Sequence, residues 1–204
     1  VFRNVFNDFY AKDTSKKVRA VFKAKGLSGK PLASKPPFGY MKSEYDKNQW
    51  VVDEEAAKVV KRIFRLCIDG YGPTQIARIL TEDRVLKPTA YYEMKKSGTV
   101  TVEKPYHWAQ NTVRKMLSNQ EYVGDTVNFK TYSKSNKLKK RLQNNPENIL
   151  IFENTHEAII YRKIFDLVQK HFAGRKRPDK QGEVDKFAGY VFCGDCGKWL
   201  YLHR

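Results

Sequence analysis

The sequence predicts an α+β protein: a mainly helical domain with a helix-turn-helix-like core and small β elements, followed by a smaller α+β domain. Three observations support this fold class. Several segments show amphipathic helical periodicity, short β-rich segments lie between them, and a cysteine pair stands near the end of the chain. With 204 residues and 41% hydrophobic content, the chain is long and apolar enough to bury real cores.

The first predicted helix covers residues 1–25, where apolar side chains recur and Gly26 follows as a helix stop. Residues 26–37 contain Gly and Pro at short intervals, which disfavours both helix and strand. We therefore expect a basic, extended linker here. Phe38 and Tyr40 flank a glycine directly after it, and we expect both rings to dock on the domain that follows.

The strongest helical signal begins at Asp53, a capping residue followed by two glutamates and a continuous apolar stripe. A short second helix is predicted at about 73–83 after a Gly-containing turn, which gives the front half of a helix-turn-helix. A third helix is expected at about 110–118. Residues 87–107 lie between them and are rich in Tyr and Thr around Ser97-Gly98, so we predict a β-hairpin.

The composition changes at Asn145-Pro146, where we place a domain boundary, so that residues 26–145 form one domain and 146–204 the start of the next. The remaining predicted elements are a strand at 123–129, a basic loop at 130–141, a strand at 149–152, an amphipathic helix at 160–172 and a β-hairpin at 190–201.

The formal net charge of +17 is concentrated in two segments. Residues 1–52 hold 11 Lys and Arg against 4 Asp and Glu, and residues 87–145 hold 12 against 4. Residues 53–86 balance at 6 against 6. Two basic segments around a neutral scaffold predict a polyanionic partner, and double-stranded DNA is the first candidate.

The outward face of the third helix carries Gln110, Asn111 and Arg114. Asn and Gln can pair with adenine and Arg with guanine in the major groove, so we predict that these residues read bases. Any surface helix shows such residues, but the neighbouring basic segments favour the DNA interpretation. The linker is either a minor-groove arm or a tether. Predicted phosphate or minor-groove contacts are Lys30, Lys35, Lys115, Lys130, Lys134, Lys137, Lys139, Lys140 and Arg141.

Cys193 and Cys196 have the spacing of a zinc knuckle, with a glycine after the second thiol. They supply half of a four-ligand site, and only His203 follows nearby. A redox pair is the alternative, but such a pair opens a helix, whereas the residues here are strand-forming. Zinc is the predicted cofactor. Cys67 falls in the apolar stripe of a helix and is predicted as core.

The four histidines are scattered and lack evident carboxylate or nucleophile partners, so no catalytic residue is predicted. The chain lacks a membrane-length apolar stretch and a secretory signal pattern, which predicts a cytoplasmic protein.

Several motifs along the whole chain resemble, in order, those of the large serine recombinases of phages and integrative transposons. They are Asn7-Asp8-Phe9-Tyr10-Ala11-Lys12-Asp13-Thr14-Ser15, Gly26-Leu27-Ser28-Gly29, Pro36-Pro37-Phe38-Gly39-Tyr40, Val52-Asp53-Glu54-Glu55-Ala56, Ile63-Phe64, Gly72, Ile76-Ala77, Trp108, Leu117-Ser118-Asn119-Gln120-Glu121-Tyr122-Val123-Gly124 and Cys193-Gly194-Asp195-Cys196-Gly197.

The resemblance implies that residues 1–25 end the long helix leaving a catalytic domain, that 26–145 are the recombinase domain and that 146–204 begin a zinc-ribbon domain. It also implies half-site binding on attachment-type DNA, a nucleophilic serine in an N-terminal domain absent from this segment, and a dimer or tetramer for the full-length protein. Two alternatives are a stand-alone helix-turn-helix transcriptional regulator and a basic RNA-binding protein.

Overall fold

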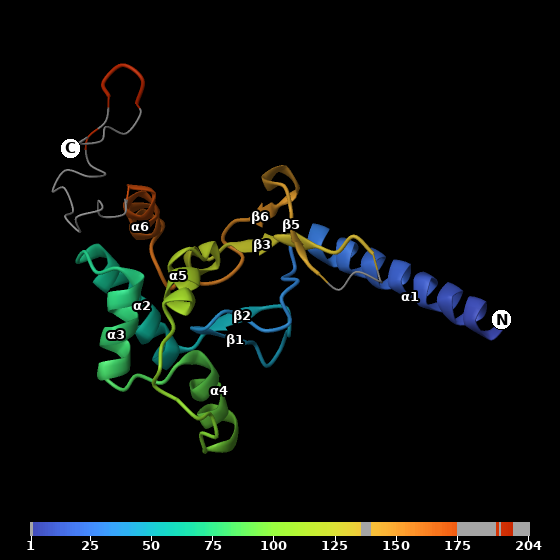
Figure 1. Ribbon diagram of the computed structural model, residues 1–204, viewed down its shortest axis with the longest axis horizontal. Coiled ribbons are helices and arrows are strands. Elements are labelled where there is room, and N and C mark those ends of the chain that lie inside the picture. The colour runs from blue at the N-terminus through green and yellow to red at the C-terminus, as the bar shows by residue number, and fades with distance from the viewer. Residues whose placement is uncertain (1, 136–139, 175–190, 192, 198–204) are drawn as a thin grey trace. The chain divides into compact units, whose positions relative to one another are not determined.

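The computed structural model describes residues 2–135, 140–174, 191 and 193–197 (Figure 1). The chain divides into two compact units. Unit 1 contains residues 1–60 and 120–160, and unit 2 contains residues 61–119 and 161–204. The described elements are mainly helices with small antiparallel β pairs, which confirms that part of the predicted fold class. The helix-turn-helix-like core and the zinc ribbon stay predictions.

Unit 1 combines one long helix with three antiparallel strand pairs. Its elements are α1 (Phe2–Leu27), β1 (Tyr40–Lys42), β2 (Trp50–Val52), η1 (Gln120–Val123), β3 (Thr126–Asn128), β4 (Thr131–Tyr132), β5 (Leu142–Gln143), η2 (Pro146–Asn148) and β6 (Leu150–Phe152). Strand β1 pairs with β2, β3 with β6, and β4 with β5. Strands β3 and β6 pair although they lie on opposite sides of Asn145-Pro146, where the sequence predicts a domain boundary. The predicted domain bounds stay a prediction.

Helix α1 confirms the helix predicted before Gly26. Apolar side chains along it remain in solvent, with Phe6 73% and Val21 68% exposed. Ion pairs between residues four apart, Asp8 with Lys12 and Asp13 with Lys17, lie on its surface, a spacing that supports a helix weakly. The described side chains of α1 therefore contribute little to the core of unit 1.

The core of unit 1 forms around Tyr40, which is fully buried. The Tyr40 hydroxyl donates to the carbonyl of Glu157 at 2.8 Å and accepts from the amide of Ile159 at 3.3 Å. The Tyr40 ring stacks on the ring of Tyr122, with centroids 6.2 Å apart. Phe38 is buried as well. The expectation that both rings after the linker dock on the following domain is confirmed.

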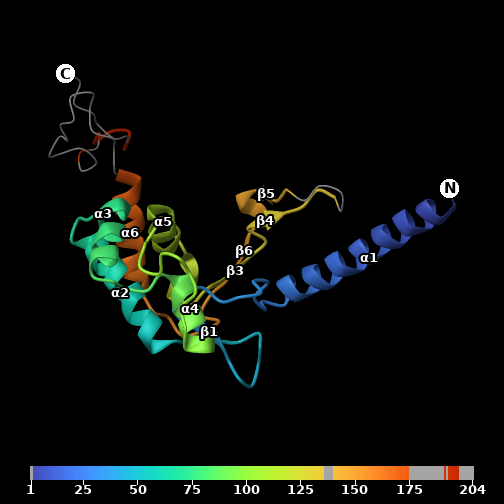
Figure 2. The same ribbon diagram turned by 60° about the horizontal axis from the view of Figure 1, so that its bottom comes forward.

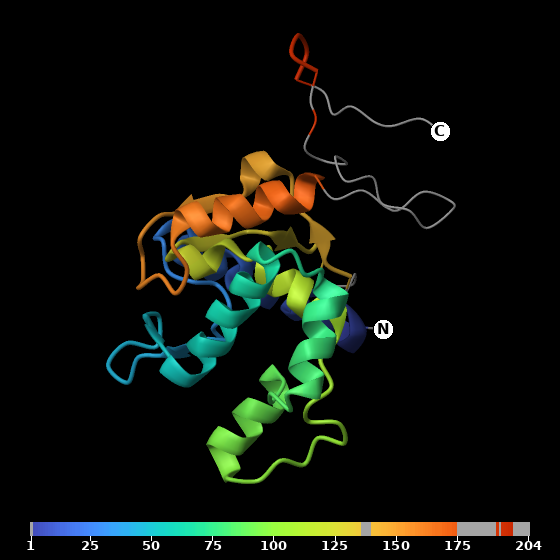
Figure 3. The same cartoon turned by 90° about the vertical axis from the view of Figure 1, so that its left-hand side faces the viewer.

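Unit 2 is helical. Helix α2 (Glu54–Ile68) begins in unit 1 and continues into unit 2, where it is followed by α3 (Pro73–Glu82), α4 (Pro88–Ser97), α5 (Gln110–Leu117) and α6 (Arg162–Gly174). Figure 3 shows α6 running beside α5. The helices predicted at Asp53, at 73–83, at 110–118 and at 160–172 are confirmed. The buried residues of unit 2 include Ile63, Phe64, Cys67, Ile76, Leu80, Trp108, Val113, Leu117, Phe165 and Val168.

The β-hairpin predicted for residues 87–107 is wrong, because residues 88–97 form helix α4. Pro88 suits the first helical turn, and Gly98 ends the helix with a φ of 71°, a left-handed conformation that glycine adopts at little cost. The Glu93 carboxylate then accepts hydrogen bonds from the amides of Thr101 and Val102. Ser97-Gly98 is therefore a helix end and the following residues form a loop.

The strands differ from prediction mainly in length. The strand predicted at 123–129 is limited to Thr126–Asn128 and follows the 3-10 turn η1, while the strand predicted at 149–152 is β6. The predicted basic loop at 130–141 contains β4, which pairs with β5 just after it, and Figure 2 shows these two strands side by side. Residues 136–139 lie outside the described residues. Of the predicted terminal hairpin, only residues 191 and 193–197 are described, and residues 194–196 form a turn.

Candidate nucleic-acid interface

Helix α5 is held against α3 and α6 by one apolar face. Val113, Met116 and Leu117 on that face are buried, and α5 contacts both neighbouring helices. Trp108, just before the helix, donates its indole N–H to the carbonyl of Val85 at 2.9 Å. Burial of three apolar side chains in an eight-residue helix fixes its rotation, so the residues between them point outward.

The outward face of α5 carries the residues predicted to read bases. Gln110, Asn111, Arg114 and Lys115 are all exposed. The side-chain oxygen of Gln110 accepts a hydrogen bond from the Thr74 hydroxyl at 2.7 Å. Among the described residues, the side chains of Asn111, Arg114 and Lys115 make no hydrogen bond or ion pair, so their donors and acceptors are available to a ligand.

The linker after α1 is anchored by Asn128, a residue that sequence reasoning missed. The buried Asn128 amide donates to the carbonyls of Gly26 at 3.1 Å and Lys30 at 2.9 Å, and it accepts from the amide of Leu32 at 3.2 Å. The Lys30 and Lys35 side chains are exposed. The anchoring fixes the backbone at Lys30 to strand β3, so the start of this segment is held in place.

The basic residues around β4 and β5 divide into two kinds. Lys134, Lys140 and Arg141 are exposed, whereas Lys130 binds the carboxylate of the largely buried Glu121 at 2.9 Å. A phosphate must compete with Glu121 for the Lys130 ammonium group. Lys137 and Lys139 lie outside the described residues.

The predicted contact residues fall in both units. Gln110, Asn111, Arg114 and Lys115 lie together on α5 in unit 2. The other described residues of the predicted set lie in unit 1, and they are Lys30, Lys35, Lys130, Lys134, Lys140 and Arg141. Each unit therefore carries its own group of predicted DNA contacts.

Cys193 and Cys196 lie at the two ends of a tight turn, and the amide of Gly197 donates to the carbonyl of Cys193 at 2.9 Å. Backbone amides of Cys196 and Asp195 lower the pKa of the Cys193 thiol, which favours the thiolate form that binds zinc. The half-site for zinc stays a prediction from the spacing of the pair. Within the described part of the chain, no group of three His, Cys, Asp or Glu residues is placed to hold a metal ion.

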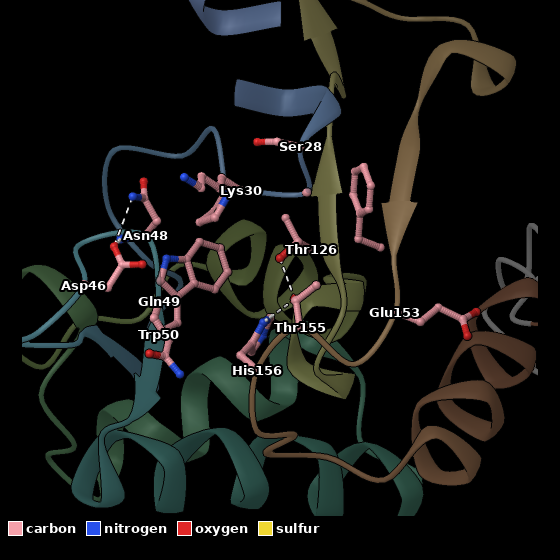
Figure 4. A pocket seen from close by; sticks show the side chains of 13 residues that line it. Ser28, Lys30, Asp46, Asn48, Gln49, Trp50, Thr126, Glu153, Thr155 and His156 are labelled. Atoms are coloured by element: carbon pink, nitrogen blue, oxygen red, sulfur yellow. Dashed lines mark hydrogen bonds between the residues drawn. The ribbon is translucent and has the colours of Figure 1, made fainter. Parts of the chain in front are cut away.

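Unit 1 also contains a pocket that the sequence did not predict (Figure 4). The His156 imidazole lies at its base, where Nε2 donates to the carbonyl of Glu121 at 2.8 Å and Nδ1 is 3.0 Å from the Thr155 hydroxyl. The Glu121 carbonyl can only accept, so Nε2 carries a proton, whereas the donor between Nδ1 and the Thr155 hydroxyl depends on the protonation state of the ring. Burial lowers the pKa of His156, which favours the neutral ring.

The chain matches the protein-family model described as Recombinase over residues 54–175. It is 34% identical over 97 residues to the Bacillus subtilis (strain 168) protein YefB, described as an uncharacterized protein, a match that covers 48% of this chain and 32% of YefB. The chain therefore spans about a third of the length of this curated relative. Among the described residues, no helix combines the length and hydropathy needed to cross a lipid bilayer.

Two solved structures are also similar. One is described as a crystal structure of an LSR–DNA complex and matches with a TM-score of 0.50 and 19% identity, covering 90% of this chain and 47% of the other. The second comes from work on the sequence requirements of the Listeria innocua prophage attP site, with a TM-score of 0.44 and 20% identity, covering 90% of this chain and 63% of the other. The first of these two matches shows a similar fold and nothing more.

Proposed function

The chain belongs to the Recombinase family, with a recombinase domain as in large serine recombinases, and on this basis we propose that it binds one half of an attachment-type site in double-stranded DNA. The membership confirms the family resemblance found in the sequence. The chain spans less than two thirds of the relatives it matches. The activity and partners of the whole protein are accordingly part of this proposal.

The observation that carries the proposal is the two-sided character of α5. Its apolar face is buried against neighbouring helices, and its outer face presents Asn111, Arg114 and Lys115 without internal partners among the described residues. An α-helix fits the major groove, where Arg recognises guanine and Asn or Gln recognises adenine. Gln110, Asn111 and Arg114 read bases in this proposal, Lys115 contacts a phosphate, and the pairing of α3 with α5 serves as a helix-turn-helix core.

The residues of unit 1 supply the sequence-independent contacts. Lys30 and Lys35 belong to a linker that follows the minor groove, as basic arms of DNA-binding proteins do. Lys130, Lys134, Lys137, Lys139, Lys140 and Arg141 bind phosphates next to the half-site. The fold match to a chain solved in an LSR–DNA complex supports this arrangement.

DNA cleavage belongs to a different part of the full-length protein in this proposal. In the family that the chain resembles, the nucleophilic serine lies in an N-terminal domain, and the complete enzyme acts as a dimer or tetramer. The present segment contributes the selection of the site. Cys193 and Cys196 provide two thiolates to a zinc ribbon, whose four-ligand site needs a second pair.

Selection from a random duplex library tests the proposal. The 204-residue chain is expected to enrich one duplex motif and to protect it in footprinting. Enrichment of single-stranded RNA loops, or equal binding to every duplex, would contradict it. A stand-alone regulator would also bind a duplex motif, and it is distinguished by the gene upstream of Val1, which under our proposal encodes a resolvase-like domain with a serine nucleophile.

A further inference from the structure

The pocket of unit 1 lies where the linker meets the loop between β1 and β2. Its lining comes from the linker around Lys30, the loop from Asp46 to Gln49, and the segment after β6 that contains Thr155 and His156. Figure 4 shows the indole of Trp50 between the Asp46 loop and the Thr126 and Thr155 side chains. Thr126 of β3 also lines it, so the pocket is assembled from four segments that are distant in the sequence.

Trp50 carries a buried N–H donor for which the described part of the chain offers no hydrogen-bond acceptor. Only 4% of the residue is exposed, and its indole Nε1 has no hydrogen-bond partner among the described residues. The ring is held by aromatic neighbours, with its centroid 5.1 Å from that of His156 and 6.2 Å from that of Tyr40. A buried N–H without an acceptor is costly and rare in folded proteins. An acceptor that arrives with a ligand removes this cost.

The charges beside Trp50 favour an anionic acceptor. The Lys30 ammonium makes no hydrogen bond or ion pair with any residue that the structure describes. Asp46, on the same side of the pocket, already accepts from the amide and side chain of Asn48. Hydrogen bonds from Asn48, aided by the charges of Lys30 and Lys25, lower the pKa of its carboxyl group. Lys25 lies outside the lining of the pocket but adds a second positive charge near this carboxylate.

Glu153 supplies the second carboxylate of the pocket, and it does not repel an anion bound beside the Trp50 indole. Figure 4 shows Glu153 at the far side, with its carboxylate directed away from the Trp50 indole. The nitrogen end of the indole lies on the side that carries Lys30, Asp46 and Asn48. Gln49 is exposed and Asn48 half-buried, so these rim side chains can rotate to admit a small group.

We propose that this pocket is a phosphate-binding site, in which the Trp50 indole N–H and the Lys30 ammonium group bind one phosphate of the DNA backbone. The inference rests on the proposed function and deepens it. It assigns Trp50 a recognition role and makes Lys30 a contact to a defined phosphate. An indole N–H donates to phosphate oxygen through a charge-assisted hydrogen bond, which is about twice as strong as a neutral one.

The first test compares stability with affinity in Trp50→Phe, which keeps an aromatic ring and removes the N–H. Phe fills less of this buried site, so the melting temperature of the free chain is expected to fall, but by about 2–4 °C less than in Trp108→Phe, because W50F removes a donor that has no acceptor. Because the phosphate loses a donor, the Kd for the selected duplex is expected to increase about tenfold. An unchanged Kd for W50F, with specific duplex binding by the wild type intact, overturns the phosphate site and leaves the proposed function standing.

A matched control is Trp108→Phe, which removes an indole N–H that does have an acceptor, the carbonyl of Val85. The same loss of ring volume is expected to lower the melting temperature further here, since that carbonyl also loses its partner. A smaller fall in W50F than in W108F identifies the unsatisfied donor as the cause. Equal falls in both variants would mean that the Trp50 N–H is already satisfied, and would overturn the inference.

The second test locates the phosphate. Each backbone phosphate of the selected duplex is replaced in turn by a neutral methylphosphonate, and Kd is measured for the wild type, W50F and Lys30→Met. One position is expected to weaken the wild type about tenfold and both variants by much less. Lys35→Met, which changes a linker lysine outside the pocket, should retain the full effect at that position. Equal losses for all four proteins at every position overturn the inference.

Inorganic phosphate offers the same acceptor oxygens as a DNA backbone phosphate, and a third experiment distinguishes these two ligands. Inorganic phosphate at millimolar concentration is expected to raise the melting temperature of the wild type more than that of W50F. If this stabilisation appears without any methylphosphonate position that depends on Trp50, the pocket takes a free anion and the assignment to DNA is wrong. If the wild-type chain binds no duplex at all, the proposed function itself fails.

Discussion

Asn128 and Gly26 stand 102 positions apart in the sequence and are joined by a hydrogen bond of 3.1 Å from the Asn128 amide to the Gly26 carbonyl. The same amide donates to the Lys30 carbonyl and accepts from the Leu32 amide. One side chain on β3 therefore satisfies three backbone groups of the segment that joins α1 to the rest of unit 1.

Replacing Asn128 with Ala is expected to lower the free energy of unfolding by about 2–4 kcal/mol, because three buried or half-buried backbone groups lose their partner. Chemical denaturation measures the change. The control is Asn148→Ala, which removes an exposed amide that donates only a long hydrogen bond of 3.5 Å to the Asn144 side chain among the described residues and should change stability by less than about 0.5 kcal/mol. Similar losses in both variants would contradict the anchoring role.

Replacing Arg114 with Ala is expected to relax discrimination at one base pair of the selected duplex, at a cost of about 1–3 kcal/mol. The matched variant Lys115→Ala changes the adjacent exposed cation and should weaken binding uniformly across sequences. Competition binding with single-base variants of the duplex measures both. Equal losses on cognate and scrambled duplexes would remove Arg114 from the base-reading set.

Lys130 and Lys134 should behave differently although both belong to the same basic loop. Lys130→Met leaves the largely buried Glu121 carboxylate without its cation, and we expect a loss of about 1–2 kcal/mol in the free energy of unfolding. Lys134→Met should leave stability unchanged and lower the slope of log Kd against log salt by about 1. The pattern is wrong if K130M alters the salt slope without altering stability.

The neutral state of His156 predicts a pH dependence of stability. Burial, opposed by Glu121 and Asp125, lowers the pKa of His156 in the folded chain below the usual value near 6.5. As pH falls, the unfolded chain binds the proton first, so stability decreases from about pH 6.5 downward and levels off below the folded pKa. Denaturation midpoints at pH 7.5 and 5.5 should differ less in His156→Gln, and an identical difference would contradict this.

The sequence predicted well those elements whose residues have one interpretation. Helices α2, α5 and α6 each carry an apolar stripe at helical spacing, and burial of that stripe decides their orientation. Ser97-Gly98 has two interpretations, because glycine with positive φ suits both a hairpin turn and a helix end. The structure has the helix end, which Pro88 in the first turn and the contacts of Glu93 with the following loop stabilise.

The contacts that matter most for the candidate interface depend on residues far apart in the sequence. Nothing near Asn128 indicates that it binds the linker a hundred residues earlier, and nothing near Lys130 indicates that Glu121 is buried beside it. Likewise, the unsatisfied indole of Trp50 appears only when the four segments of its pocket are folded together. Such long-range pairings have no periodic signature in a single sequence.

The packing of the Phe129 ring on Gly26 has a consequence for protein engineering. A methyl group at Gly26 would collide with that ring, while the described side chains of α1 from Phe6 to Ala24 lie largely in solvent. Chimeras that exchange the upstream helix for one from another source should therefore place their junction before Gly26 and keep this glycine. A fusion point moved downstream would cut into the anchored segment and compromise the hybrid.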